Sequence, residues 1–433
     1  VFSKTLLYAS YLVGEISDDI VSIDNALKWG FGWDVGPFEV WDALGFEKTL
    51  KRMKEDRKEI PDWINEMYKQ GSHSFYKIEN GIIYYYDLKS KSYIKKPGQD
   101  SLIILNNIEK KNIIWENKDS IIKDIGDGII NLEFRTKMNT LGQGVLMGIN
   151  KSVDLAEKNY KGIVIGNEGS HFSAGANLGA IFMASAEQEY DEINLAIKFF
   201  QDSMMKLRYS SVPVIAAPHG LTLGGGCEVT MHCDKAVVYS ESYIGLVEVG
   251  AGLIPGGGGC KEMALRASKK FRKNDVELNV LQEYFLNIGM AKTSTSAHEA
   301  IDLGYLEPNN DTIVMNRNHQ ISIAKKHAIL MSDYGYLPPC KEKNIKVLGK
   351  QALGMFMVGS DTMKAGKYIS DHDKKIANKI AYVISGGDLS QATFVDEQYL
   401  LDLEREAFLS LCSERKTLER IQHILKTGKP LRN

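Results

Sequence analysis

The feature that most constrains the fold is a regular alternation of short apolar runs with longer helical stretches in the middle of the chain. Apolar runs at 162–165, 214–217 and 236–239 have the length of buried strands. Between them, 187–205 and 225–232 are expected to be helical. Strands that alternate with helices at this spacing build α/β domains with largely parallel strands. Functional sites in such domains lie at strand ends, where loops lead into helix N-termini.

The character of the sequence changes on either side of this alternation, which divides the chain into four segments. Residues 1–75 space their apolar side chains as helices do, and we expect them to form a helical domain. Short β-branched and aromatic runs between polar turns make 76–119 a connector with its own small strands. We expect the α/β domain at 120–310 and a helical C-terminal extension at 311–433.

Local signals add expectations at single positions. We expect Ser22 to cap a short helix that ends at Gly30. The tryptophans within 29–44 are expected to pack between short helices. The run 113–115 is assigned to the connector, whereas the Asp-Gly turn within 121–134 predicts a β-hairpin.

Composition excludes several classes of protein. Of the 433 residues, 44% are hydrophobic and 25% are charged, and the formal net charge of -2 gives no general attraction to nucleic acid. No apolar run approaches the ~20 residues that cross a bilayer, so we expect neither membrane insertion nor a signal peptide. Five cysteines without a C-x-x-C pair favour reduced thiols in the cytoplasm over zinc or disulfides. Because the chain starts with Val1, we expect it to be a piece of a longer protein.

Three segments rich in small residues follow predicted strands: 171–178, 219–228 and 244–259. Small residues leave backbone N–H groups uncovered, and the N–H groups at a helix start bind negative charge. Two such donors that converge on one oxygen form an oxyanion hole, and each stabilises a transition state by about 3 kcal/mol. Glu228 lies about one helical turn beyond the second glycine loop, and Glu248 follows the next strand. Two facing carboxyl groups can divide the work of accepting and donating a proton.

Each of these signals alone also has a purely structural explanation. A run of glycines is often a turn or packing device, and a glutamate early in a helix often only complements the helix dipole. No Walker A loop and no dinucleotide-binding G-x-G-x-x-G loop occurs in the sequence. We expect His171 and His219 to be packed or exposed, Cys227 to be a buried thiol, and 371–373 to be solvated surface rather than a metal site.

Taken in order, the motifs resemble those of the crotonase (enoyl-CoA hydratase/isomerase) family over about 120–310. The similarity is carried by FSAGANL (172–178), AAPHGLTLGGGCEVTMHCD (216–234), IGLVEVGAGLIPGGGG (244–259) and SAHEAIDLGYL (296–306). The resemblance implies an α/β fold with a ββα spiral core, and an acyl-CoA thioester as substrate.

The same resemblance implies roles for four residues. It places the two oxyanion N–H groups on Ala176 and Gly225, and the two catalytic glutamates on Glu228 and Glu248. The presence of both glutamates favours an enoyl-CoA hydratase, which adds water to trans-2-enoyl-CoA in fatty-acid β-oxidation. The alternatives are a Δ3,Δ2-enoyl-CoA isomerase, which can work with a single base, and a truncated module without catalytic activity.

Several small residues are expected to contact the substrate. The resemblance implies that the adenine and pantetheine chain of CoA lie along Ala174, Ala176 and Leu178, with Gly225 and Gly257 also at the substrate. It implies no metal and no cofactor beyond the CoA of the substrate itself. Members of the family are often trimers or pairs of trimers, so a homo-oligomer is expected.

One position departs from the family pattern, and the flanks resemble other β-oxidation proteins. Asn177 stands where the family usually has Asp, and 179–181 lacks a lysine often found there. Residues 22–45 resemble the C-terminal helical domain of 3-hydroxyacyl-CoA dehydrogenases, and 397–433 resemble the end of fused proteins. The resemblance implies the C-terminal part of a bifunctional protein (fatty oxidation complex alpha type) without its nucleotide-binding domain. NAD binding and dehydrogenase activity are therefore not expected of this chain.

Overall fold

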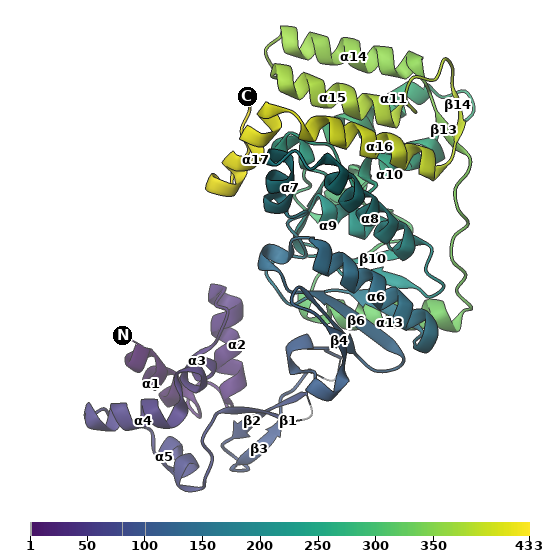
Figure 1. Ribbon diagram of the computed structural model, residues 1–433. Coiled ribbons are helices and arrows are strands. Elements are labelled where there is room, and N and C mark those ends of the chain that lie inside the picture. Colours follow the sequence, from purple (N-terminus) through teal and green to yellow (C-terminus); the bar gives the residue numbers. More distant parts are fainter. Residues whose placement is uncertain (1, 80, 100) are drawn as a thin grey trace. The chain divides into compact units, whose positions relative to one another are not determined.

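The computed structural model describes residues 2–79, 81–99 and 101–433. The chain divides into two compact units, Val1–Glu109 and Lys110–Asn433, which we call the N-terminal and the C-terminal unit (Figure 1). This division is coarser than the four segments expected from the sequence, and the expected connector is shared between the two units.

The N-terminal unit combines helices and a small sheet around one aromatic core. Its elements are α1 (Phe2–Leu12), α2 (Ile20–Phe31), α3 (Pro37–Leu44), α4 (Phe46–Glu55), α5 (Asp62–Lys69), β1 (Tyr76–Glu79), β2 (Ile82–Asp87) and β3 (Ser92–Lys95). The three strands pair antiparallel in chain order. Trp41 and Phe75 are fully buried with ring centroids 5.3 Å apart, and Phe46 packs against both. These aromatic rings form the centre of the unit.

Two local predictions in the N-terminal unit were wrong. Asp19, and not Ser22, caps α2, because the helix starts earlier than predicted and the Asp19 carboxylate accepts the Ser22 N–H at 2.7 Å. Trp29 and Trp33 are 77% and 45% exposed, so among the three tryptophans of this stretch only Trp41 packs in the core. Trp29 near the end of α2 and Trp33 just after it therefore belong to the surface.

The C-terminal unit is built on a seven-stranded sheet in the order β12-β10-β8-β7-β6-β5-β4. Its strands are β4 (Ile113–Glu116), β5 (Ser120–Asp124), β6 (Ile129–Phe134), β7 (Gly162–Ile165), β8 (Val214–Ala216), β10 (Lys235–Tyr239) and β12 (Thr312–Val314). The strands from β6 to β12 run parallel, and β4 and β5 pair antiparallel at one edge. The predicted hairpin is confirmed as β5 and β6. Because β4 pairs with β5, the run 113–115 belongs to this sheet and not to a connector.

Helices make up most of the remaining C-terminal unit. They are α6 (Gln143–Asn159), α7 (Leu178–Ala186), α8 (Tyr190–Arg208), α9 (Gly225–His232), α10 (Gly259–Lys270), α11 (Glu277–Gly289), α12 (Ala297–Asp302), α13 (Gln320–Asp333), α14 (Lys350–Ala365), α15 (Asp371–Ile384), α16 (Glu397–Cys412) and α17 (Arg415–Thr427). A short antiparallel pair, β13 (Ile345–Val347) and β14 (Thr393–Val395), joins the last group of helices. In Figure 1 the yellow helix α16 runs beside α10 and α8, and α17 packs on α7.

A second sheet of two parallel strands, β9 (Gly220–Leu223) and β11 (Ser242–Gly245), completes the core. In chain order β8, β9 and α9 form one strand–strand–helix repeat, and β10, β11 and α10 form the next. Each repeat thus gives one strand to the large sheet and one to the small sheet. The predicted α/β class, with a ββα spiral core and helical segments beside it, is confirmed.

Helices cover both faces of the large sheet. Val145 of α6 and Ile163 of β7 lie in the same apolar cluster. Side chains alternate along a strand, so the neighbouring Gly162 faces the other way. A Cβ added there would lie 3.2 Å from Ala328 of α13. The missing side chain therefore lets α13 approach the sheet closely.

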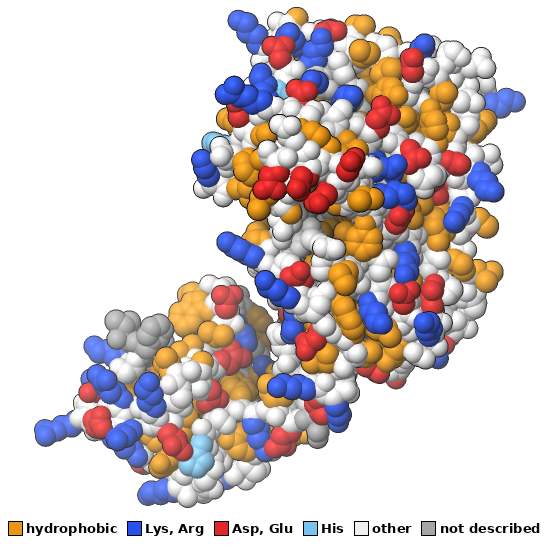
Figure 2. Space-filling view, in the orientation of Figure 1, with side chains coloured by type: hydrophobic (Ala, Val, Ile, Leu, Met, Phe, Trp, Pro, Cys, Tyr) orange, Lys and Arg blue, Asp and Glu red, His pale blue; other side chains and the backbone are white. Residues whose placement is uncertain are grey.

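The surface carries both signs of charge. Figure 2 shows Lys and Arg side chains interspersed with Asp and Glu over the face drawn, in keeping with the net charge of -2. Among the helices of the described residues, none is long and apolar enough to cross a membrane.

Candidate active site

The first loop of the site is held as an extra strand beside β9. The Ser173 N–H donates to the Leu221 carbonyl at 3.1 Å, and the Leu223 N–H donates to the Ser173 carbonyl at 3.0 Å. On its other side, the Leu141 N–H donates to the Gly175 carbonyl at 2.8 Å. These bonds fix the loop between two neighbouring segments, so its backbone N–H groups have a defined direction.

The two glycine-rich loops touch through their backbones. Gly175 has a φ of 98°, and a Cβ there would lie 2.9 Å from the Leu223 carbonyl oxygen and 3.5 Å from the Gly225 nitrogen. Only glycine fits this position, because the backbone conformation and the close approach both exclude a side chain. Ala176 follows at once, so both expected oxyanion donors lie at this contact. Within the described part of the chain, the Ala176 and Gly225 N–H groups donate to no protein acceptor.

A cavity of about 470 Å³ opens at this contact. Six of the seven predicted site residues line it: Ala174, Ala176, Leu178, Gly225, Glu228 and Glu248. Apolar side chains close much of the remaining wall, among them Phe200 of α8, Phe408 of α16 and Ile424 of α17. The structure therefore brings the expected oxyanion donors and both glutamates to one largely apolar cavity, which we call the Glu228/Glu248 cavity.

Glu228 is held by two backbone donors. The N–H groups of Gly257 and Gly259 both donate to its Oε1 at 2.8 Å. Burial raises the pKa of the Glu228 carboxyl to about 7, against the lowering effect of these two hydrogen bonds. Gly257, the seventh predicted residue, does not line the cavity but donates a hydrogen bond to Glu228. Its neighbour Gly256 lines the cavity instead.

Glu248 is the less satisfied of the two glutamates. It follows β11 at the start of a 3-10 turn, and its Oε2 is buried without a hydrogen-bond partner among the described residues. Burial, and then the neighbouring Glu228 carboxylate, raise the pKa of Glu248 well above its ordinary value. The cavity therefore holds two carboxyl groups whose pKa values are both raised, chiefly because burial disfavours their charged forms.

The residue that departs from the family pattern keeps a structural role. The Oδ1 of Asn177 accepts the N–H groups of Gly179 and Ala180 at 3.1 and 3.3 Å. Asn177 is thus the N-cap of α7, a position where Asn and Asp are about equally favourable. The change from Asp leaves the start of α7 and the preceding Ala176 N–H in place.

The remaining candidates lie outside the Glu228/Glu248 cavity. Burial lowers the pKa of His219 to about 4 and raises that of the Cys227 thiol well above its usual value, which disfavours the reactive thiolate. The prediction of solvated surface at 371–373 was wrong for two residues. His372 and Asp373 are buried, because α17 places Thr417 Oγ1 2.9 Å from His372 Nε2 and pairs Arg420 with Asp373 at 2.8 Å. No group of His, Cys, Asp and Glu suited to a metal ion occurs among the residues that the structure describes.

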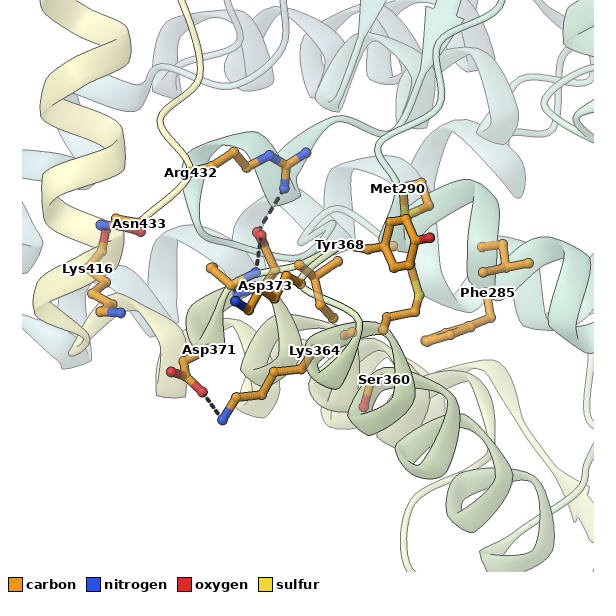
Figure 3. A pocket seen from close by; sticks show the side chains of 17 residues that line it. Phe285, Met290, Ser360, Lys364, Tyr368, Asp371, Asp373, Lys416, Arg432 and Asn433 are labelled. Carbon is orange, nitrogen blue, oxygen red and sulfur yellow. Dashed lines mark hydrogen bonds and ion pairs between the residues drawn. The ribbon is translucent and has the colours of Figure 1, made fainter.

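A second cavity, of about 620 Å³, shares two lining residues with the first (Figure 3). These are Met290 and Arg432, and Arg432 donates to the Asp373 carboxylate at 2.8 Å. Lys364 pairs with Asp371 at the same cavity. No glutamate and no predicted site residue lines it, so the expected chemistry is confined to the Glu228/Glu248 cavity.

Sequence reasoning missed one buried carboxylate near the site. Glu404 of α16 is fully buried, and its Oε1 accepts the Gly258 N–H at 2.6 Å. The signal was present, because Glu404 lies at helical spacing among buried apolar residues such as Leu400 and Phe408. A charged residue within an apolar stripe needs a partner, and here the partners are backbone N–H groups.

A methyl group added at Gly224 is expected to disturb both the backbone and Glu248. Its φ is 52° and its ψ is −120°, and a Cβ would lie 2.8 Å from Glu248 Oε1. We expect Gly224→Ala to cost about 1–3 kcal/mol of stability through backbone strain. The displaced Glu248 should lower kcat by at least about tenfold. Thermal unfolding and steady-state hydration of crotonyl-CoA measure the two effects.

Gly354 of α14 provides the matched control for this substitution, since a Cβ there meets no atom within 4 Å. Gly354→Ala should leave kcat unchanged and should raise the thermal stability slightly, because alanine is about 0.5–1 kcal/mol more favourable than glycine within a helix. If Gly224→Ala behaves in the same way as Gly354→Ala, the position inferred for Glu248 is incorrect.

Comparison with known proteins shows which families and proteins this chain is similar to. Residues 124–274 match the family model described as enoyl-CoA hydratase/isomerase. A probable 3-hydroxyacyl-CoA dehydrogenase of Bacillus subtilis (strain 168) is 44% identical over 431 residues, covering 100% of this chain and 54% of that protein. A putative fatty acid oxidation complex trifunctional enzyme of Rickettsia felis is 28% identical over 429 residues, covering 98% of this chain and 52% of that protein.

Among solved structures, an enoyl-CoA hydratase from Bacillus halodurans aligns with a TM-score of 0.48 at 13% identity, covering 70% of this chain and 99% of that one. The chain spans about half the length of the curated relatives named above. Its homologues thus include proteins named for fatty acid oxidation, and the segment that holds both glutamates matches the enoyl-CoA hydratase/isomerase family.

Proposed function

We propose that this chain is an enoyl-CoA hydratase that adds water across the double bond of trans-2-enoyl-CoA thioesters. The observation that supports this most is the shared cavity, where two unoccupied backbone N–H groups and two glutamates with raised pKa values meet. A second carboxyl group is what hydration requires beyond simple isomerisation, because one group must take a proton from water while another supplies one to carbon.

The proposed mechanism assigns each group one task. The N–H groups of Ala176 and Gly225 donate to the thioester oxygen and stabilise the negative charge that develops there. Glu228 accepts a proton from water through Oε2, since both backbone donors bind its Oε1. The water oxygen bonds to Cβ, and Glu248 gives its proton to Cα. A 3-hydroxyacyl thioester results, and the proton taken up by Glu228 replaces the one lost by Glu248 after exchange with solvent.

Incubation with crotonyl-CoA tests the proposal, because hydration abolishes the ultraviolet absorbance of the conjugated thioester. The proposal predicts that the absorbance is lost and that 3-hydroxybutyryl-CoA is formed. Conversion of a 3-enoyl-CoA to the conjugated thioester without any hydration would instead support an isomerase. Absence of both reactions would support a module without catalytic activity.

The division of roles between an ionised proton acceptor and a protonated donor predicts a bell-shaped pH dependence. Glu228 must be ionised to accept a proton, so kcat/KM should rise with pH through its pKa of about 7. Glu248 must be protonated, so kcat/KM should fall at higher pH, where this carboxyl group ionises. Initial rates measured from roughly pH 5 to 10 give this profile. A rate that does not change over that range would contradict the assignment of the two roles.

The larger protein is a separate proposal. We infer that the chain forms part of a fatty acid oxidation protein of about twice its length, as in the relatives it matches. The dehydrogenase activity named for the Bacillus subtilis protein would then reside in the half that this chain does not cover. Incubation of the chain with a 3-hydroxyacyl-CoA and NAD should give no NADH if this division of labour is correct.

A further inference from the structure

The segment 257–261 presents consecutive backbone N–H groups to two different carboxylates. Glu404 receives three of them: its Oε1 accepts the Gly258 N–H at 2.6 Å, and its Oε2 accepts those of Cys260 and Lys261 at 2.8 and 3.2 Å. The segment leads into α10, whose N-terminal N–H groups have no intrahelical acceptors. Glu404 therefore accepts the N–H groups of Cys260 and Lys261 in the first turn of α10.

The donors alternate between the two carboxylates. Gly257 and Gly259 donate to Glu228, whereas Gly258 between them donates to Glu404. Gly258 has a φ of 105°, a conformation that side chains rarely permit and that turns its N–H away from those of its neighbours. Movement of the segment away from Glu404 would therefore also carry the two Glu228 donors out of place.

A second contact ties the same turn to α16. The Nζ of Lys261 binds the carboxylate of Glu397 at 3.2 Å, so two glutamates of α16 anchor one turn of α10. Glu404 does not line the Glu228/Glu248 cavity. Glu404 can therefore act on the chemistry by two routes, through the position of the segment 257–261 and through its charge, which raises the pKa of Glu248.

We propose that Glu404 is a positioning residue, which holds the 257–261 segment so that Gly257 and Gly259 can stabilise the ionised form of Glu228. This inference rests on the proposed hydratase function for its kinetic consequences. Its structural part, the anchoring of the segment, can be measured without any substrate.

The variant Glu404→Gln tests the proposal because glutamine keeps the shape of the side chain. Its single carbonyl oxygen can accept on one side only, and its NH2 group faces a backbone N–H that then has no acceptor. The 257–261 segment should shift and weaken the two hydrogen bonds to Glu228. We expect kcat to fall by about 10- to 100-fold and KM to change by less than about threefold. The lower pH midpoint of kcat/KM should rise by about one unit, because ionised Glu228 loses stabilising donors.

Glu406→Gln is the matched control, since Glu406 lies on the same helix and is exposed. Amide hydrogen exchange, followed by mass spectrometry, gives the readout that does not depend on activity. Exchange at 257–261 should become faster in Glu404→Gln than in the parent and should be unchanged in Glu406→Gln. Glu404→Asp keeps the carboxyl group with a shorter reach and gives a second variant for the same measurement.

The outcomes separate this inference from the proposed function. Faster exchange at 257–261 together with an upward shift of the lower pH midpoint supports the positioning role. Unchanged exchange, or a downward shift of that midpoint through simple removal of a negative charge, overturns it even if hydration by the parent is normal. If the parent hydrates no enoyl thioester, the proposed function fails, while faster exchange would still show that Glu404 anchors the segment.

Discussion

Replacing Glu228 with glutamine is expected to lower kcat for crotonyl-CoA hydration by about 10³- to 10⁴-fold. Glutamine keeps the size of the side chain, and its carbonyl oxygen can still accept the N–H groups of Gly257 and Gly259. In the proposed mechanism the substitution therefore removes the proton acceptor and leaves the fold. KM should stay within a few-fold of the parent, because the mechanism assigns the thioester oxygen to the Ala176 and Gly225 N–H groups. Stopped-time product analysis measures rates that are too slow for continuous assay.

Two controls accompany the Glu228→Gln measurement. The thermal midpoint of unfolding should not decrease, since the substitution removes a carboxyl group that burial disfavours in its charged form. The exposed Glu406→Gln variant should hydrate crotonyl-CoA like the parent. Hydration by Glu228→Gln within tenfold of the parent would show that another group accepts the proton.

Replacing Glu248 with glutamine should also lower kcat by about 10³-fold or more, for a different reason. Glutamine cannot give a proton to Cα, although its amide has the shape of the protonated carboxyl group that the proposed mechanism requires. The residual activity should no longer decline at high pH, because the group that ionises there has been removed. A kinetic profile over pH for this variant measures both effects.

The double variant of Glu228 and Glu248 adds a sharper criterion. If the two groups act in one step, the double variant should be only slightly slower than the worse single variant, because the second substitution removes a partner that no longer works. A loss equal to the product of the two single losses would show that they act independently. That outcome would contradict a shared proton-transfer step.

The local motifs carried most of the information about the site. Gly175 is needed where two backbones touch, and Gly225 leaves room for the side chains of Leu141 and Phe200, so both glycines mark places where backbone N–H groups stay uncovered. Glu228 lies one turn into α9 for reasons of helix geometry alone. Such features depend on short stretches of chain, and a sequence pattern expresses them directly.

Contacts between distant segments explain what sequence reasoning could not provide. Glu404 accepts the N–H of Gly258, which lies 146 residues earlier, and no local sequence pattern predicts that contact. The strand at 113–115 has the composition of many short strands, and only its pairing with β5 assigns it to the large sheet. The sequence around His372 and Asp373 is typical of a surface, but a later helix places Thr417 against His372 and Arg420 against Asp373.

A crystal structure with a bound acyl-CoA, such as 3-hydroxybutyryl-CoA, would test the central claim most directly. The thioester oxygen should lie about 2.7–3.1 Å from the backbone nitrogens of both Ala176 and Gly225. The Cβ hydroxyl should lie within hydrogen-bond reach of Glu228, with Glu248 beside Cα. A thioester bound in the second cavity, or a carbonyl turned away from both nitrogens, would contradict the account.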